Sequence, residues 1–177
     1  MNNPGSKTRD RIHTHIEDGA GIHFNELVRE SDFAPGQIQY HVRQLIDQGR
    51  VVRDEFYGQT HYYPPDYDEW ERAVLALFRR ETAREIVVYI IEHEPTTPNA
   101  VADDLGIARS TLEYHLKHLT KHEVVEKEYD DRNRVLLRLA NPEETGRLLT
   151  LVKPTVPDRL IDQFTRLVDQ LFENPDN

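Results

Sequence analysis

The stretch Ile38–Leu45 reads IQYHVRQL, and the stretch Leu112–Leu119 reads LEYHLKHL, so a Tyr-His pair and a closing Leu recur 74 positions later. In both stretches the apolar residues fall four and then three positions apart, which is the spacing of one face of an α-helix. The chain therefore carries the same amphipathic helix twice, and its fold has to account for that repetition.

The 74-residue offset aligns apolar residues well beyond these two helices. The aligned pairs include Ile12 with Ile86, Ile16 with Ile90, Leu27 with Val101, Phe33 with Ile107, and Val51 with Val125. Polar positions are rarely identical, so the repeat preserves a hydrophobic pattern, as duplicated domains of one fold do. We therefore expect two tandem domains with the same fold.

Each copy has the pattern of three short helices followed by a hairpin. The predicted helices are about 8–18, 24–31 and 35–48 in the first copy, and about 82–93, 98–105 and 109–122 in the second. The predicted strands are 51–53 and 61–63 in the first copy, and 124–127 and 135–137 in the second. The intervening residues 57–59 and 130–133 are rich in turn-forming types.

The turn between the second and third helices is clearest in the second copy. There Gly106 is placed to end one helix in the left-handed conformation, and Ser110 is expected to cap the next. The first copy lacks an equivalent glycine and has Pro35, which suits a first helical turn, followed by Gly36, so its turn is expected to be looser. Helix, turn, helix and β-hairpin together outline a winged helix-turn-helix.

A family resemblance agrees with this outline. The stretch TLEYHLKHLTKHEVVEK, and more loosely QIQYHVRQLIDQGRVVRD, resembles the recognition helix and first wing strand of archaeal and bacterial winged-helix transcriptional regulators. The resemblance covers residues 8–65 and 82–140. It implies a mainly α fold with small β wings (α+β) and a regulator that binds double-stranded DNA. Because the same scaffold also serves as a protein-interaction domain, a module that reads no base sequence is the alternative.

The predicted organisation has four parts. Residues 1–65 form the first domain, 66–81 a connecting helix, 82–140 the second domain, and 141–177 a linker with a C-terminal amphipathic helix. Trp70 lies on the apolar face of the connecting helix, where we expect it to pack between the domains. The C-terminal segment between Pro157 and Pro175, with Asp158 as a predicted N-cap, has a wide apolar stripe that must be covered by the same chain or by a second copy. A homodimer through this helix is the favoured arrangement.

The candidate DNA contacts are the polar residues that face away from the apolar stripe of each third helix, together with the wings. Gln and Arg suit bidentate contacts to adenine and guanine edges, whereas Lys suits phosphates. The first-copy candidates are Gln37, Gln39, Tyr40, Arg43, Gln44 and Arg53. The second-copy candidates are Arg109, Ser110, Thr111, Glu113, Tyr114, Lys117, His118, Lys121, Arg132 and Arg134.

The two wings differ in charge. Arg132 and Arg134 surround the tip of the second wing and suit a minor groove, which favours the second copy as the stronger binder. Asp130 and Asp131 beside them would repel phosphate unless they hydrogen-bond within the turn. A purely structural wing is the alternative.

Composition limits the remaining classes of function. The chain has 177 residues, 32 acidic against 22 basic, a formal net charge of −10 and no cysteine, which excludes disulfides and thiolate chemistry. Few of the basic residues are Lys, and this mixture resembles proteins of salt-accumulating halophilic microbes; an ordinary acidic protein is the alternative. The absence of a long apolar run and of a signal-peptide core predicts a cytoplasmic protein without membrane insertion.

Neither a metal site nor an enzyme is predicted. His115, His118 and His122 share one helix face, but the first copy repeats only His115, as His41. Packing or DNA contact is therefore the expected role of this histidine, and no metal or other cofactor is expected. We find no glycine-rich phosphate loop and no nucleophile motif, so catalysis is not expected.

Overall fold

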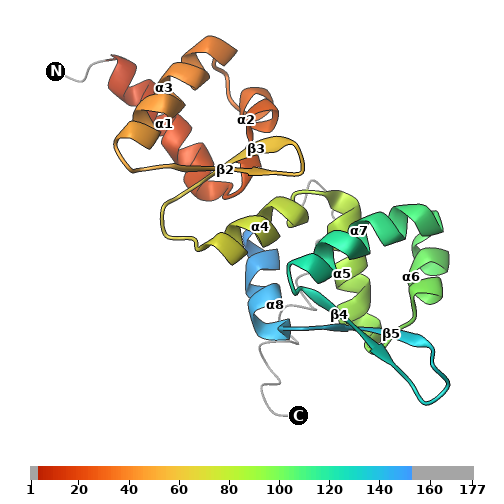
Figure 1. The fold of residues 1–177 in the computed structure, drawn as a ribbon. Coiled ribbons are helices and arrows are strands. Elements are labelled where there is room, and N and C mark those ends of the chain that lie inside the picture. The colour runs from red at the N-terminus through yellow and green to blue at the C-terminus, as the bar shows by residue number, and fades with distance from the viewer. Residues whose placement is uncertain (1–3, 153–177) are drawn as a thin grey trace. The chain divides into compact units, whose positions relative to one another are not determined.

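The computed structural model describes residues 4–152, and the chain divides into two compact units, Met1–Ala76 and Leu77–Asn177 (Figure 1). Each unit contains short helices and a small antiparallel sheet. The predicted fold class, mainly α with small β wings, is therefore confirmed.

The first unit follows the winged-helix order. Its elements are α1 (Pro4–Asp18), β1 (Ile22–His23), α2 (Phe24–Glu30), α3 (Pro35–Asp47), β2 (Val52–Phe56), β3 (Gln59–Tyr63) and most of α4 (Glu69–Phe78). The strands form one antiparallel sheet in the order β1-β3-β2, with Ile22 opposite Tyr62 and Val52 opposite Tyr63. Strand β1 was not predicted, because two residues are too few to show an alternating pattern.

An apolar cluster joins the three helices of the first unit. It includes Ile12 and Ile16 of α1, Leu27 of α2, and Ile38 and Leu45 of α3, all of them fully buried. These are the residues that the repeat aligns with apolar partners in the second copy. The stripe that defines the helix in the sequence is therefore the stripe that packs in the core.

The start of α4 is fixed to the sheet of the first unit. A capping box begins the helix: Glu71 N–H donates to Asp68 Oδ1 and Asp68 N–H donates to Glu71 Oε2, both at 2.8 Å. Arg72 Nε donates to Asp54 Oδ2 on β2 at 2.9 Å, and Tyr63 Oη of β3 donates to the Arg72 carbonyl at 2.7 Å. Helix α4 lies within the predicted connecting segment 66–81, and its residues up to Ala76 belong to the first unit.

The second unit repeats the same order. Its elements are α5 (Glu81–His93), α6 (Pro98–Leu105), α7 (Arg109–Lys121), β4 (Val125–Tyr129), β5 (Val135–Leu139) and α8 (Pro142–Leu151). Strands β4 and β5 form an antiparallel pair, with Val125 opposite Leu139. Thr96, which the repeat aligns with Ile22 of β1, forms one isolated bridge to Leu137, so the third strand is reduced to a single pairing.

The bounds of the two third helices follow the repeat without a shift, whereas the bounds of the hairpin strands shift. Helix α7 begins at Arg109 and ends at Lys121, and α3 begins at Pro35 and ends at Asp47, so both bounds differ by 74 positions. The second hairpin has the longer turn, with five residues between its strands where the first hairpin has two. The core positions Leu112, Leu116 and Leu119 of α7 are fully buried, as the aligned positions of α3 are.

The two helix-turn-helix turns match the prediction in one respect and correct it in another. Gly106 ends α6 in the left-handed conformation, with φ 64°, as predicted. Ser110 does not cap α7: the N-cap is Ala108, and Ser110 lies inside the first turn. Ala34 begins α3 with nearly the same dihedral angles, so an extended alanine precedes both third helices in place of a side-chain cap.

The segment after Asn141 begins with a helix that the sequence analysis did not predict. The Asn141 side chain accepts a hydrogen bond from Glu144 N–H at 3.3 Å, and Pro142 occupies the first turn of α8. Leu148 and Leu149 are buried. The predicted C-terminal amphipathic helix after Pro157 lies outside the described residues.

Candidate nucleic-acid interface

Helix α3 separates its residues into two faces as predicted. Ile38, Val42 and Leu45 are buried, whereas the candidates Gln37, Gln39, Tyr40 and Arg43 are exposed. The Tyr40 side chain is 59% exposed, which is unusual for an aromatic residue on a well-packed helix. These exposed side chains can contact DNA if α3 lies in a groove.

Hydrogen bonds divide the α3 candidates into two groups. Gln44 is half-buried: its Oε1 accepts from Arg9 Nη1 at 2.6 Å and its Nε2 donates to Tyr40 Oη at 2.8 Å. Gln37 Oε1 accepts from Ala34 N–H at 3.2 Å and so caps the helix start. These two glutamines stabilise α3, whereas no hydrogen bond or ion pair within residues 4–152 engages the side chain of Gln39 or Arg43.

Helix α7 presents the equivalent row in the second unit. Thr111, Tyr114, Lys117 and Lys121 are exposed, and Tyr114 is 48% exposed. Tyr114 occupies the position of Tyr40, and Lys117 occupies that of Arg43. Arg80 Nη1 donates to Tyr114 Oη at 2.9 Å, so in this unit an arginine orients the tyrosine, where Gln44 does so in the first.

Glu113 of α7 pairs with two basic side chains. Its Oε1 accepts from Arg109 Nε at 3.1 Å, and its Oε2 lies 3.6 Å from Lys127 Nζ on β4. Arg109 also bonds to Asn99 of α6. The candidate Arg109 is therefore engaged in the first turn of α7, and the three charged side chains together carry one positive charge.

The tip of the second wing is closed by Asp130. Its Oδ1 accepts from the N–H groups of Arg132 and Arg134, both at 2.9 Å, and its Oδ2 accepts from Arg134 Nε at 2.7 Å. The bonds from Arg134 hold the pKa of the Asp130 carboxyl below its usual value. Asp130 thus hydrogen-bonds within the turn, and Arg134 is already paired, whereas the Arg132 side chain is exposed.

The first wing is built differently. Tyr57 and Gly58, the two residues between its strands, both have positive φ, at 55° and 75°, as a type I′ turn requires. The candidate Arg53 is exposed on β2.

The histidines of α3 and α7, together with His122, are wholly or partly buried, and burial lowers their pKa values. His41 and His115 occupy equivalent buried positions, and each ring meets the preceding tyrosine edge-on, with centroids 5.1 and 5.2 Å apart. Burial, and then the nearby Arg9 or Arg80, lowers the pKa of both imidazoles. Burial also lowers the pKa of His118 and of His122. Across residues 4–152, no three His, Asp or Glu side chains are placed to hold a metal ion.

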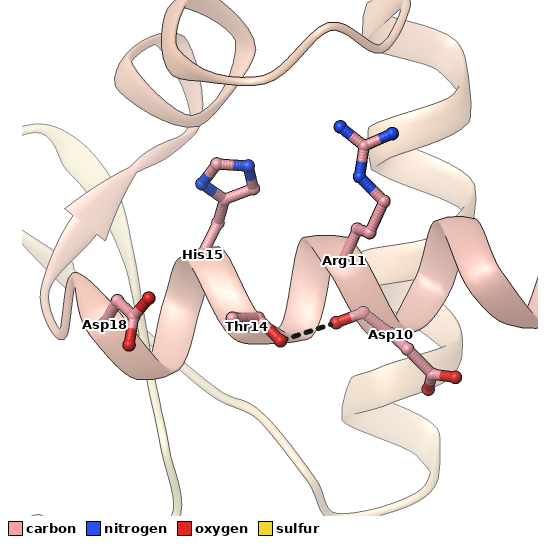
Figure 2. A pocket seen from close by; sticks show the side chains of 5 residues that line it. All are labelled: Asp10, Arg11, Thr14, His15 and Asp18. Atoms are coloured by element: carbon pink, nitrogen blue, oxygen red, sulfur yellow. Dashed lines mark hydrogen bonds between the residues drawn. The ribbon is translucent and has the colours of Figure 1, made fainter.

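A surface hollow lies along α1 of the first unit, lined by Asp10, Arg11, Thr14, His15 and Asp18. Figure 2 shows Arg11 and His15 pointing to one side of the helix, whereas Asp10 points away from them. Thr14 Oγ1 donates to the Asp10 carbonyl at 3.0 Å, so its hydroxyl is hydrogen-bonded to the backbone of the same helix. These side chains do not converge on a common point as a catalytic group would.

The comparisons with known proteins agree with this geometry. The family described as an N-terminal HTH domain matches residues 6–75, and the family described as a helix-turn-helix domain matches residues 80–128. The chain therefore contains two helix-turn-helix domains, one in each unit. Within the described residues, no helix is both long and apolar enough to cross a membrane.

The comparisons also matched individual proteins, including the two that follow. An uncharacterised HTH-type transcriptional regulator of Methanocaldococcus jannaschii is 29% identical over 129 residues, which are 73% of this chain and 32% of that protein. The chain thus spans about a third of the length of this relative. The mRNA-binding domain of the elongation factor SelB from E. coli, solved with SECIS RNA, is 20% identical over 75% of this chain and 98% of that one, with a TM-score of 0.29, too low to define a shared fold.

Proposed function

We propose that the chain is a transcriptional regulator that binds duplex DNA through α3 and α7. The similarity to an HTH-type regulator and the two matching helix-turn-helix families support this function. In such motifs the second helix lies in the major groove and its N-terminal half contacts base edges. On α3 this half carries the exposed Gln39 and Tyr40, and on α7 it carries the exposed Thr111 and Tyr114. The cations Arg43 and Lys117 follow just after it.

The repetition of this exposed row is the observation that carries the proposal. Tyr40 and Tyr114 are both exposed at the same helical position, and each is followed three residues later by an exposed cation, Arg43 or Lys117. Core packing explains why buried apolar residues recur in both helices, but it does not explain why the same types of exposed residue recur. A shared ligand that contacts both helices explains why an aromatic ring and a cation recur there.

The test is a binding selection from random duplex DNA with the full chain, at several KCl concentrations. We expect an enriched sequence motif. Binding that falls with salt but enriches no motif would contradict sequence-specific reading.

The second candidate function is a winged-helix module for protein interaction or chromosome architecture that reads no base sequence. The observation that favours it is the net charge of −10, together with the pairing of Arg109, Lys127 and Arg134 to carboxylates. Such a surface attracts phosphate weakly. The same selection separates the two functions, because only the first enriches a motif.

We also propose that the chain is a homodimer through its C-terminal segment, which lies outside the described residues. The support is the apolar repeat in the sequence between Pro157 and Pro175. A chain that ends before Asp158 should be monomeric in light scattering at concentrations where the full chain is dimeric. A dimer that survives the truncation would place the interface elsewhere.

The proposed setting is the salt-rich cytoplasm of a halophilic archaeon. The support is the excess of acidic residues over a basic set that contains few lysines, together with the relative from Methanocaldococcus jannaschii. If so, the melting temperature should rise steadily between 0.1 and about 2 M KCl, because salt screens the repulsion among carboxylates. A melting temperature that falls with KCl would contradict this setting.

A further inference from the structure

The fifth position of each third helix differs between the two units in a chemically specific way. Gln39 occupies it in α3 and Glu113 occupies it in α7, and both side chains are exposed beside the exposed tyrosine of their helix. This position lies in the N-terminal half of the helix, the half that contacts base edges in helix-turn-helix proteins. The two helices therefore offer different groups at one equivalent place.

An amide and a carboxylate suit different bases. The amide of Gln both donates and accepts, which matches N7 and the N6 amino group of adenine. An ionised carboxylate only accepts, which matches the N4 amino group of cytosine. A change from Gln to Glu at a base-reading position therefore changes the preferred base.

A carboxylate in a DNA groove is repelled by the phosphates unless nearby cations neutralise it, and Glu113 has two such cations. Arg109 Nε and Nη2 both lie 3.1 Å from its Oε1, and Lys127 Nζ lies 3.6 Å from its Oε2. The longer contact to Oε2 leaves this oxygen able to accept a further hydrogen bond from a base. In α3 the position equivalent to Arg109 is Pro35, so this cation occurs only beside the acid, whereas the 74-residue offset aligns Lys127 with Arg53.

We propose that the two recognition helices read different bases at this position, adenine through Gln39 and cytosine through Glu113. The binding site then consists of two unlike half-sites. This inference rests on the proposed function, since it requires that α3 and α7 enter DNA grooves. Gln39 and Glu113 then distinguish the two half-sites by the base that each selects.

The test compares binding selections from random duplex DNA for the wild-type chain, Glu113→Gln and Gln39→Glu. Glu92→Gln is the matched control, because it removes the same charge from an exposed position on α5. Circular dichroism melting checks that every variant is folded, and exposed ion pairs contribute too little to stability for Glu113→Gln to unfold the unit.

We expect Glu113→Gln to lose a preference for cytosine of about tenfold at one position of one half-site and to gain adenine there. Gln39→Glu should lose the adenine preference in the other half-site and bind all sites more weakly, because no cation stands at Pro35. Glu92→Gln should leave the motif unchanged.

Three results would overturn the inference. If the wild-type chain enriches no motif, the proposed function fails and the inference fails with it. If a motif is enriched but neither substitution changes a base preference, the function stands and the inference alone is wrong. If Glu113→Gln raises affinity for every sequence equally, Glu113 only opposes phosphate binding and reads no base.

Discussion

The two units have equivalent cores and surfaces of different chemistry. In the first unit the exposed row of α3 contains neutral amides and Arg43, which forms no ion pair with the described residues 4–152. In the second unit Glu113 binds Arg109 and Lys127 beside the equivalent row of α7. The buried positions of α3 and α7 match at a constant offset. The comparison shows that duplication preserved what the fold requires and one exposed Tyr-cation pair, while the charges around that pair diverged.

The largest expected effect tests whether the two cores are equivalent. Leu45→Ala and Leu119→Ala each remove a fully buried leucine at the same place in the repeat, so each should lower the free energy of unfolding of its own unit by about 2–5 kcal/mol. Hydrogen exchange measured residue by residue assigns the loss to a unit. Similar losses support equivalent cores, and a loss below 1 kcal/mol in either unit would contradict them.

Lowering the pH should destabilise the second unit more than the first. Burial lowers the pKa of His115, His118 and His122 in the second unit and of His41 in the first. Because these folded-state pKa values lie below the usual value of 6.5, the unfolded chain takes up more protons as the pH falls past 6.5. Stability is therefore complete above that pH and is lost as the pH falls toward the folded-state values, and more of it is lost in the second unit.

Urea unfolding at pH 8 and pH 5.5, followed by hydrogen exchange in each unit, measures this difference. His122→Gln should reduce the pH dependence of the second unit and leave that of the first unchanged. A larger acid sensitivity in the first unit would show that the histidine environments have been misassigned.

The smallest expected effect concerns the second wing. Among the described residues, few exposed cations on the third helices and wings lack a carboxylate partner. We therefore expect a plot of the logarithm of affinity against the logarithm of KCl concentration to have a slope of about −4 or shallower. Asp130→Asn releases Arg134 from its carboxylate and should steepen this slope by about one unit. Asp131→Asn is the matched control, since it removes a neighbouring charge that does not pair with Arg134.

Filter binding or fluorescence anisotropy across a KCl series, on a selected DNA site, gives these slopes. A wild-type slope of about −6 or steeper would mean that many more phosphates are neutralised than the described cations allow. Identical slopes for Asp130→Asn and Asp131→Asn would mean that Arg134 does not reach the phosphate backbone.

The helices could be predicted from the sequence because their signals are local. The apolar spacing of Ile38, Val42 and Leu45 defines a buried face, and the left-handed conformation at Gly106 follows from its place after a helical stretch. The outward direction of Tyr40 and Arg43 then follows from the position of the buried face. Most of the candidate row was predictable for this reason.

Other features depend on contacts between distant residues or on signals too short to recognise. Strand β1 has two residues and exists because β3 pairs with it. The contact between Glu113 and Lys127 requires α7 and β4 to be packed together, which no local pattern shows. Helix α8 begins with a typical N-terminal pattern, in which Asn141 is followed by Pro142 and two glutamates. The polar composition of the segment nevertheless favours the prediction of a linker.

The claim that the third helices read DNA is tested most directly by Arg43→Ala and Lys117→Ala on a selected site and on each of its single-base variants. We predict that Arg43→Ala loses about 1–3 kcal/mol of discrimination at one base pair, because arginine bonds guanine in a bidentate manner. Lys117→Ala should weaken binding to every sequence by a similar factor, as a phosphate contact does. Unchanged binding by both variants would remove α3 and α7 from the interface and contradict the proposed function.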